Sequence, residues 1–143
     1  MDLTINEALQ KALNEQKKGN LADAEKLYRF ILNSKITEID YSIVYINFGI
    51  LLTGLGNFEE SEIFLKKAID MKPDFSEAHF NLGNTLKLQG KLDEAVLSFK
   101  ESLRFKSNYS DGYNNLGSAF LDKGCIEEAE IYFKKAIELN PND

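Results

Sequence analysis

Asparagine side chains recur at a fixed interval along this chain of 143 residues. Asn47, Asn81 and Asn115 are evenly spaced, and glycine follows each of them two positions later. An asparagine side chain holds a carbonyl acceptor and an amide donor, so a row of asparagines can pair with both polar groups of a peptide bond. The spacing favours a surface that binds an extended peptide. Asparagines that only cap or bridge helices, or that persist as copies of one repeat, would give the same spacing.

Residues of the types that perform catalysis are few. His79 is the only histidine and Cys125 the only cysteine, so neither has the partners that nucleophilic catalysis or a usual zinc site requires. Carboxylates recur in pairs at the expected starts of helices, where the helix dipole favours negative charge: Glu59–Glu60, Asp93–Glu94 and Glu127–Glu128. We therefore expect a packed, partly exposed His79, an incidental Cys125 thiol, no metal, no cofactor and no enzymatic activity.

Composition narrows the classes of partner. The formal net charge is −6, which disfavours nucleic-acid backbones and anionic membrane surfaces. The longest apolar run, residues 43–56, is too short and too rich in glycine to span a bilayer. A single cysteine excludes an internal disulfide framework, and the opening residues predict no secretion signal. A cytoplasmic protein that binds neither nucleic acid nor membrane is expected.

A short repeat organises the sequence, with the same period as the asparagines. The stretches that carry the asparagines align with a shared glycine and a shared terminal glycine: INFGILLTGLG (46–56), FNLGNTLKLQG (80–90) and NNLGSAFLDKG (114–124). Self-similarity at such a period indicates a repeat architecture. The chain divides into one more divergent unit and three regular ones, at about 5–41, 42–75, 76–109 and 110–143.

Each unit is expected to hold two helices. In the unit 76–109, Gly90 favours a helix end because glycine adopts a left-handed backbone readily, which predicts helices over about 76–89 and 92–105. Thr4 with Glu7 resembles a capping box for the first helix of the chain. Gly83 is expected to lie opposite the small residue Ala95 of the second helix. The two helices should therefore cross closely there, with Phe99 packed around the contact.

The pattern resembles the tetratricopeptide repeat (TPR) family over nearly the whole chain. The last unit carries the pattern as Tyr113, Leu116, Gly117, Phe120, Gly124, Ala129, Phe133, Ala136 and Pro141. The resemblance implies an all-α fold, a right-handed superhelical solenoid of antiparallel helix pairs with four repeats and about eight helices. It also implies a concave wall made by the first helix of each pair.

The resemblance places the candidate binding residues on that wall. We expect a peptide-binding groove lined by Gln10, Asn47, Ile50, Phe80, Asn81, Asn84, Asn114, Asn115 and Ser118. The amides at equivalent positions are similar to the asparagine ladder of O-linked N-acetylglucosamine transferase repeats. The cationic residues of the family's carboxylate clamp have no match here, since the corresponding places hold Leu9, Asn47, Glu77 and Asn81.

The favoured function is a protein–protein interaction scaffold that binds an extended segment of a protein or peptide partner. The alternative is the N-terminal, substrate-recruiting region of a larger enzyme, for example one like a glycosyltransferase. A relation to RNA-binding helical repeats is disfavoured by the acidic charge. The last helix carries apolar residues where another helix would normally follow, namely Ile131, Phe133, Ile137 and Leu139. This end is therefore expected to self-associate, unless the chain continues beyond residue 143.

Overall fold

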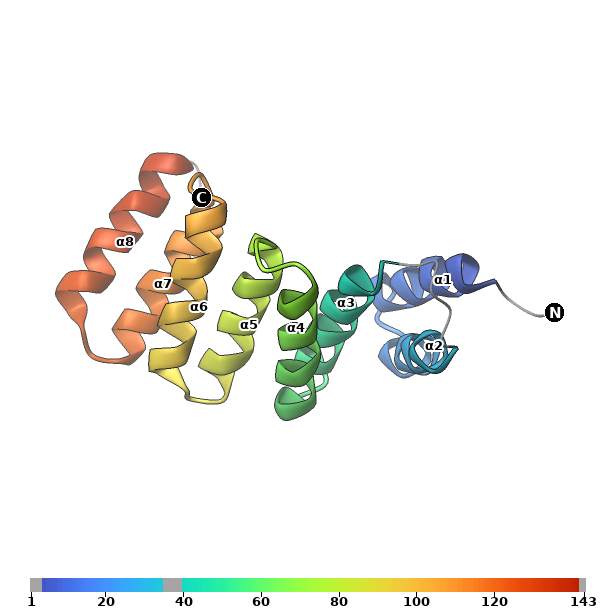
Figure 1. The fold of residues 1–143 in the computed structure, drawn as a ribbon. Coiled ribbons are helices and arrows are strands. Elements are labelled where there is room, and N and C mark those ends of the chain that lie inside the picture. Colours follow the sequence, from blue (N-terminus) through green and yellow to red (C-terminus); the bar gives the residue numbers. More distant parts are fainter. Residues whose placement is uncertain (1–3, 35–39, 142–143) are drawn as a thin grey trace.

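The computed structural model describes residues 4–34 and 40–141, which form eight α-helices and no strand. Successive helices pack as pairs, and the pairs stack in a row (Figure 1). The predicted all-α solenoid of helix pairs is confirmed, although residues 35–39 of the first predicted unit lie outside the described residues. The helices are α1 Ile5–Lys17, α2 Leu21–Asn33, α3 Tyr41–Gly54, α4 Phe58–Met71, α5 Ser76–Leu88, α6 Leu92–Phe105, α7 Ser110–Asp122 and α8 Ile126–Leu139.

Local sequence determines where the helices begin and end. Gly90 has a φ of 76°, and Lys91 donates its backbone N–H to the Leu86 carbonyl at 2.9 Å, which closes the end of α5 as predicted. The glycine after α1, α3 and α7 has the same conformation. At the start of α1, Glu7 and Thr4 exchange hydrogen bonds of 3.3 and 2.8 Å, so the predicted capping box is present.

The glycine within a first helix makes room for a large side chain of the second. A Cβ atom at Gly83 would lie 2.7 Å from the Phe99 ring, and one at Gly49 would lie 2.7 Å from Leu65. The predicted close crossing is confirmed, but an aromatic or leucine side chain occupies the space left by the glycine. The small residue has its own role in one pair, where Ser61 donates to the Gly49 carbonyl at 2.7 Å.

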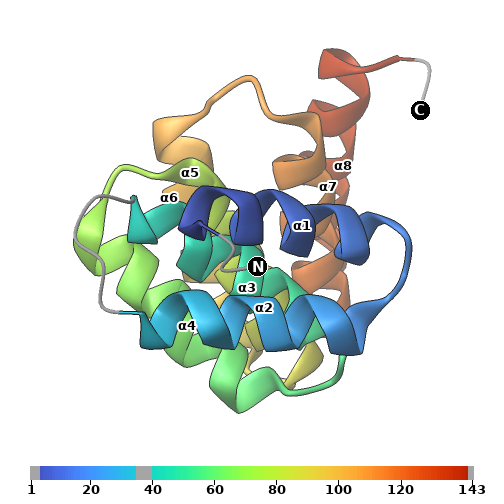
Figure 2. The same cartoon turned by 90° about the vertical axis from the view of Figure 1, so that its right-hand side faces the viewer.

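The core continues from one helix pair into the next. Leu82, Phe99 and Leu116, from α5, α6 and α7, are buried in one cluster. Burial of one such side chain stabilises the folded state by about 1.5–3 kcal/mol. Here the buried side chains hold neighbouring pairs together as well as the two helices of one pair. Figure 2 shows α1 and α2 side by side at the N-terminal end, in front of the other helices.

One junction also contains buried hydroxyl groups. Thr53 lies 2.7 Å from Ser61 and 2.8 Å from Thr85, so α3, α4 and α5 are joined by side-chain hydrogen bonds. Each of these hydroxyls has hydrogen-bonding partners, as buried polar groups require. The following junction has Ala95 and Ala119 where this one has Ser61 and Thr85.

Candidate functional site

The first helices of the pairs form a common wall. Helices α1, α3, α5 and α7 contact one another in this order, so side chains at equivalent positions lie in rows. Asn47, Asn81 and Asn115 form such a row, and each is partly exposed. We call the surface formed by α3, α5 and α7 around this row the asparagine wall.

The three asparagines differ in their hydrogen bonds. Asn81 donates its side-chain amide to the Glu77 carbonyl of its own helix at 2.8 Å, a local contact that the sequence did not indicate. The second N–H and the carbonyl oxygen of this amide are left for another partner. Asn47 and Asn115 make no side-chain hydrogen bond to other described residues, so the donors and acceptors of both amides are left for a ligand or water.

A pocket of about 250 Å³ lies beside Asn81. Ile50 of α3 and Phe80 of α5 form its apolar part together with Tyr109, the residue that precedes α7. The rings of Phe80 and Tyr109 are 4.9 Å apart, centroid to centroid. The pocket is completed by the polar residues Ser76, Glu77, Asn81 and Lys106. It can hold one large side chain next to an amide that is able to bind a peptide bond.

Charges of both signs lie around this pocket. Burial, and then the nearby carboxylates of Asp111 and Glu77, raise the pKa of the Tyr109 hydroxyl. The Lys106 ammonium lies 4.3 Å from the centre of the Tyr109 ring, a cation–π contact. Glu77, Asp111 and Lys106 make no ion pair within the described residues. The surroundings of the pocket therefore offer charged groups to a bound segment.

The predicted groove residues fall into three places: the asparagine wall with its pocket, a pocket on α1, and a pocket between α7 and α8. Ile50, Phe80 and Asn81 line the pocket just described, and Asn47, Asn84, Asn115 and Ser118 lie on the same wall, partly exposed. Ser118 accepts a hydrogen bond of 2.8 Å from Lys87, which also lies 3.8 Å from Asp122. Gln10 lines a separate pocket on α1 with Lys11, Leu13, Asn14 and Lys17.

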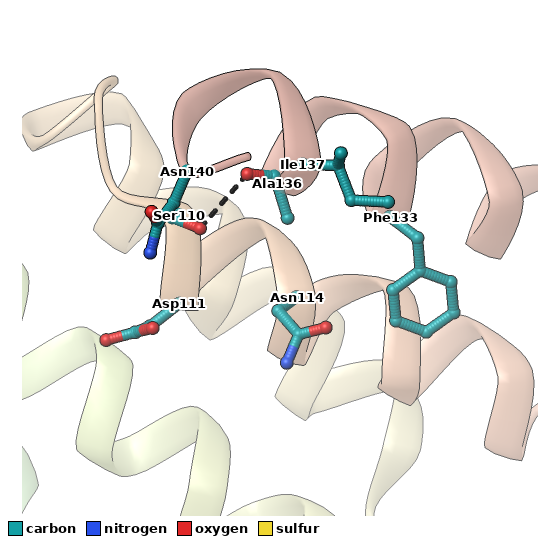
Figure 3. A pocket seen from close by; sticks show the side chains of 7 residues that line it. All are labelled: Ser110, Asp111, Asn114, Phe133, Ala136, Ile137 and Asn140. Atoms are coloured by element: carbon teal, nitrogen blue, oxygen red, sulfur yellow. Dashed lines mark hydrogen bonds between the residues drawn. The ribbon is translucent and has the colours of Figure 1, made fainter. Parts of the chain in front are cut away.

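Asn114 lies in the third place, a pocket of about 330 Å³ between the start of α7 and the end of α8. Figure 3 shows Ser110, Asp111 and Asn114 on one side and Phe133, Ala136 and Ile137 on the other. The Ser110 hydroxyl donates to the Ala136 carbonyl at 3.1 Å. Asn114 therefore lines a pocket between α7 and α8 that is separate from the one beside Asn81.

Sequence reasoning did not place Tyr109 or Lys106 at the binding surface. Both precede α7, outside the first helices from which the groove residues were chosen. The available signal was the repeat itself. Tyr109 and Lys106 lie one full repeat after Phe75 and Lys72, which form a similar ring and ammonium contact of 5.6 Å.

The residues with catalytic potential occupy structural positions. The His79 ring stacks on Phe105 at 5.6 Å and its Nε2 lies 2.8 Å from the Pro73 carbonyl oxygen, which confirms the packed, partly exposed role. Cys125 precedes α8 and is partly exposed. Within residues 4–34 and 40–141, no cluster of three histidine, cysteine or acidic side chains could hold a metal ion. No helix in the same ranges is long and apolar enough to cross a membrane.

Solved structures show the same fold. A crystal structure of MamA is 21% identical, with a TM-score of 0.86 over 96% of this chain and 79% of that chain. MamA from Desulfovibrio magneticus RS-1 is 14% identical, with a TM-score of 0.88 over 98% and 77% of the two chains. YrrB, described as a TPR protein with an unusual peptide-binding site, is 21% identical with a TM-score of 0.84 over 97% and 70%.

Family profiles match the sequence itself. Profiles described as tetratricopeptide repeat match residues 43–75, 64–96 and 110–143, and one described as TPR repeat matches residues 83–124. A comparison with curated protein sequences gave no match. The four matches jointly cover residues 43–143, and those over 43–75 and 110–143 coincide with the pairs α3–α4 and α7–α8. The chain belongs to the tetratricopeptide repeat family.

Proposed function

We propose that this protein is a scaffold, rather than an enzyme, that binds an extended segment of a partner protein along the asparagine wall. The observation that carries the proposal is the row of Asn47, Asn81 and Asn115, whose side chains are partly exposed on three neighbouring helices. Neighbouring helices are about 8–10 Å apart, which an extended peptide crosses in about three residues. Successive asparagines of the row can therefore pair with approximately every third peptide bond of the bound segment.

The pocket beside Asn81 adds a side-chain preference to this backbone contact. Ile50, Phe80 and Tyr109 give it apolar walls, so a large apolar or aromatic side chain of the bound segment fits there. Aromatic pairs contribute about 0.5–1.5 kcal/mol beyond the area that they bury. The description of YrrB as a TPR protein with a peptide-binding site agrees with this class of ligand.

Replacement of the three asparagines by alanine tests the proposal. Peptides selected by the wild-type protein from a displayed library of random extended sequences should bind the Asn47→Ala, Asn81→Ala, Asn115→Ala variant about tenfold more weakly or worse. The matched control replaces two exposed asparagines at the second helices, Asn33 at the end of α2 and Asn57 before α4, by alanine. Circular dichroism should show the same helical content in all three proteins. Unchanged peptide affinity in the triple variant would refute the proposal.

A second form of this function is the recruiting region of a larger enzyme, with the wall holding the substrate protein. The chemistry of the wall is the same in both cases, and the full-length reading frame decides between them. A cytoplasmic location is part of the proposal, because its expected partner is a soluble protein segment.

The exposed apolar residues of α8 favour one further association. Ile126 and Ile131 are each more than half exposed, and apolar surface of this kind marks interaction sites. Self-association through α8 is the contact that the sequence predicts. Light scattering across a range of concentrations measures it, and a strictly monomeric protein would exclude it.

A further inference from the structure

Inside the solenoid, the first helix of the next pair and the residue before it cover one side of each helix pair. Tyr109 packs on Phe80, and a Cβ atom at Gly112 would lie 2.8 Å from the Leu103 side chain of α6. One pair earlier, Phe75 and Ala78 pack in one cluster with Ala68 of α4. In both junctions an aromatic residue precedes the next helix, and a small residue follows it three positions later. The two segments are Phe75–Ser76–Glu77–Ala78 and Tyr109–Ser110–Asp111–Gly112.

The last helix pair presents an equivalent surface with nothing over it among the described residues. Phe133 and Ile137 of α8 occupy the repeat positions that Phe99 and Leu103 occupy in α6. Leu103 is 8% exposed beneath α7, whereas Ile137 is 58% exposed. Two adjoining pockets, of about 330 and 350 Å³, share Phe133 and Ile137 as lining residues.

The surface already has the shape of an interior junction. Ser110 donates to the Ala136 carbonyl at 3.1 Å, as Ser76 does to the Ser102 carbonyl at 2.9 Å in the preceding pair. These bonds fix the start of the first helix against the end of the second helix in both pairs. An occupant would therefore meet a preformed site, which lowers the cost of binding.

We propose that the end face formed by Ser110, Asn114, Phe133, Ala136 and Ile137 is a docking site for a partner helix. The partner helix follows an aromatic residue, and glycine or alanine stands three positions after that residue. The small residue lets the helix approach Ile137, as Gly112 approaches Leu103. The aromatic ring enters the pocket of Figure 3, beside Asn114.

A folded second copy of this chain does not offer such a segment. Its Phe75 and Tyr109 segments already fill its own interior junctions. Its first helix begins at Ile5, with polar, exposed Asn6 and Glu7 and no aromatic residue at its cap, which is Thr4. Continuity with the interior junctions thus favours a partner helix of the stated sequence over self-association at this pocket.

The chain itself supplies a probe. A synthetic peptide with the sequence of residues 107–123 contains Tyr109, Gly112 and the whole of α7, and a side-chain crosslink keeps it helical. Titration into the ¹⁵N-labelled protein should give saturable shifts for amides at the end face, with a Kd of about 1 mM or lower. The Ile137→Glu variant should bind about tenfold more weakly. The matched control is Ile131→Glu, since Ile131 is 63% exposed on the same helix but lines neither pocket.

Peptide variants separate this docking from general stickiness. The Gly112→Leu and Tyr109→Ser peptides should each bind about tenfold more weakly than the parent peptide. Equal binding of the Gly112→Leu peptide, or shifts confined to the asparagine wall, would overturn the proposal. So would the absence of saturable shifts at millimolar peptide. A dimer of the free protein that Ile137→Glu dissociates and that excludes the peptide would identify a second copy as the occupant instead. Because the asparagine variant leaves this face unchanged, failure here and failure of groove binding are distinguishable.

Discussion

The two ends of this solenoid share one architecture and have different surfaces. The exposed residues of α1 are polar or charged, and a capping box closes its first turn. On α8, Ile126 and Ile131 are each 63% exposed and Ile137 is 58% exposed. Terminal repeats normally need a polar outer face. The repeat pattern therefore specifies how pairs stack, while a few surface positions of α1 and α8 set how polar each outer face is.

The same contrast exists between an interior pair and the last pair. Phe99 is fully buried between α5 and its neighbours, whereas the equivalent Phe133 is only partly buried. Since each repeat contacts only its neighbours, a side chain of α8 has no described helix pair beyond it, whereas its equivalent in α6 is packed by α7. Equivalent substitutions in the two pairs should therefore have unequal effects on stability.

The largest loss of stability is expected at the helix-interior glycines. Gly83→Leu forces a side chain into the buried Phe99 ring, which a Cβ atom alone would approach to 2.7 Å. We expect the free energy of unfolding to fall by about 3 kcal/mol and the Tm by about 10 °C. Gly117→Leu should cost about 1 kcal/mol less than Gly83→Leu, because Phe133 can move toward the pockets of the end face. Urea denaturation measures the free energy of unfolding of both variants, and thermal unfolding measures the Tm.

Gly54→Leu is the matched control for these two variants. Gly54 ends α3, and a Cβ atom there would meet nothing within 4 Å. Its effect should stay within about 0.5 kcal/mol. Equal losses for Gly83→Leu and Gly117→Leu would contradict the freedom assigned to Phe133 at the open end.

Truncation of the equivalent side chains Leu103 and Ile137 gives the next largest loss. Leu103→Ala removes a side chain that is 8% exposed beneath α7 and should cost about 2–3 kcal/mol. Ile137→Ala, at 58% exposure, should cost less than about 1 kcal/mol. A loss at Ile137 as large as that at Leu103 would mean that the end face is already covered in solution, and sedimentation would then show the covering copy.

The features that the sequence predicted well are local ones. The capping box at Thr4 and the helix end at Gly90 depend on residues within one turn of each other. Close crossing at Gly83 was predictable because the repeat placed a glycine at the same point in three units. Such features need only the backbone preferences of a few residues and the period of the pattern.

Contacts that join different helix pairs were less predictable. The hydroxyls of Thr53, Ser61 and Thr85 come from three helices, and the repeat does not preserve them. The bond from Asn81 to the Glu77 carbonyl depends on a side-chain rotamer that the sequence does not specify. Tyr109 reaches the pocket from the segment before α7, so a search confined to first helices did not include it.

The smallest expected loss of stability concerns ion pairs within and between helix pairs. Glu62 of α4 pairs with Lys66 on its own helix and with Lys91 before α6, at 2.6 and 2.8 Å. Hydrogen bonds from these two ammonium groups lower the pKa of Glu62 to about 2 from an ordinary value of 4.5. By contrast, Glu130 of α8 pairs only within its helix, with Lys134, and its side chain is 63% exposed.

Because the folded state lowers the pKa of Glu62, its contribution to stability is complete above about pH 4.5 and is lost as the pH falls toward 2. Glu62→Gln should therefore lower the free energy of unfolding at pH 7 by about 1 kcal/mol and flatten its decline between pH 4.5 and 2. Glu130→Gln should leave both nearly unchanged, since an exposed pair within one helix joins no neighbouring pairs. Urea denaturation at a series of pH values measures the two profiles. If the two variants gave the same profile, the ion pairs of Glu62 would stabilise the solenoid no more than the ion pair of Glu130 within α8.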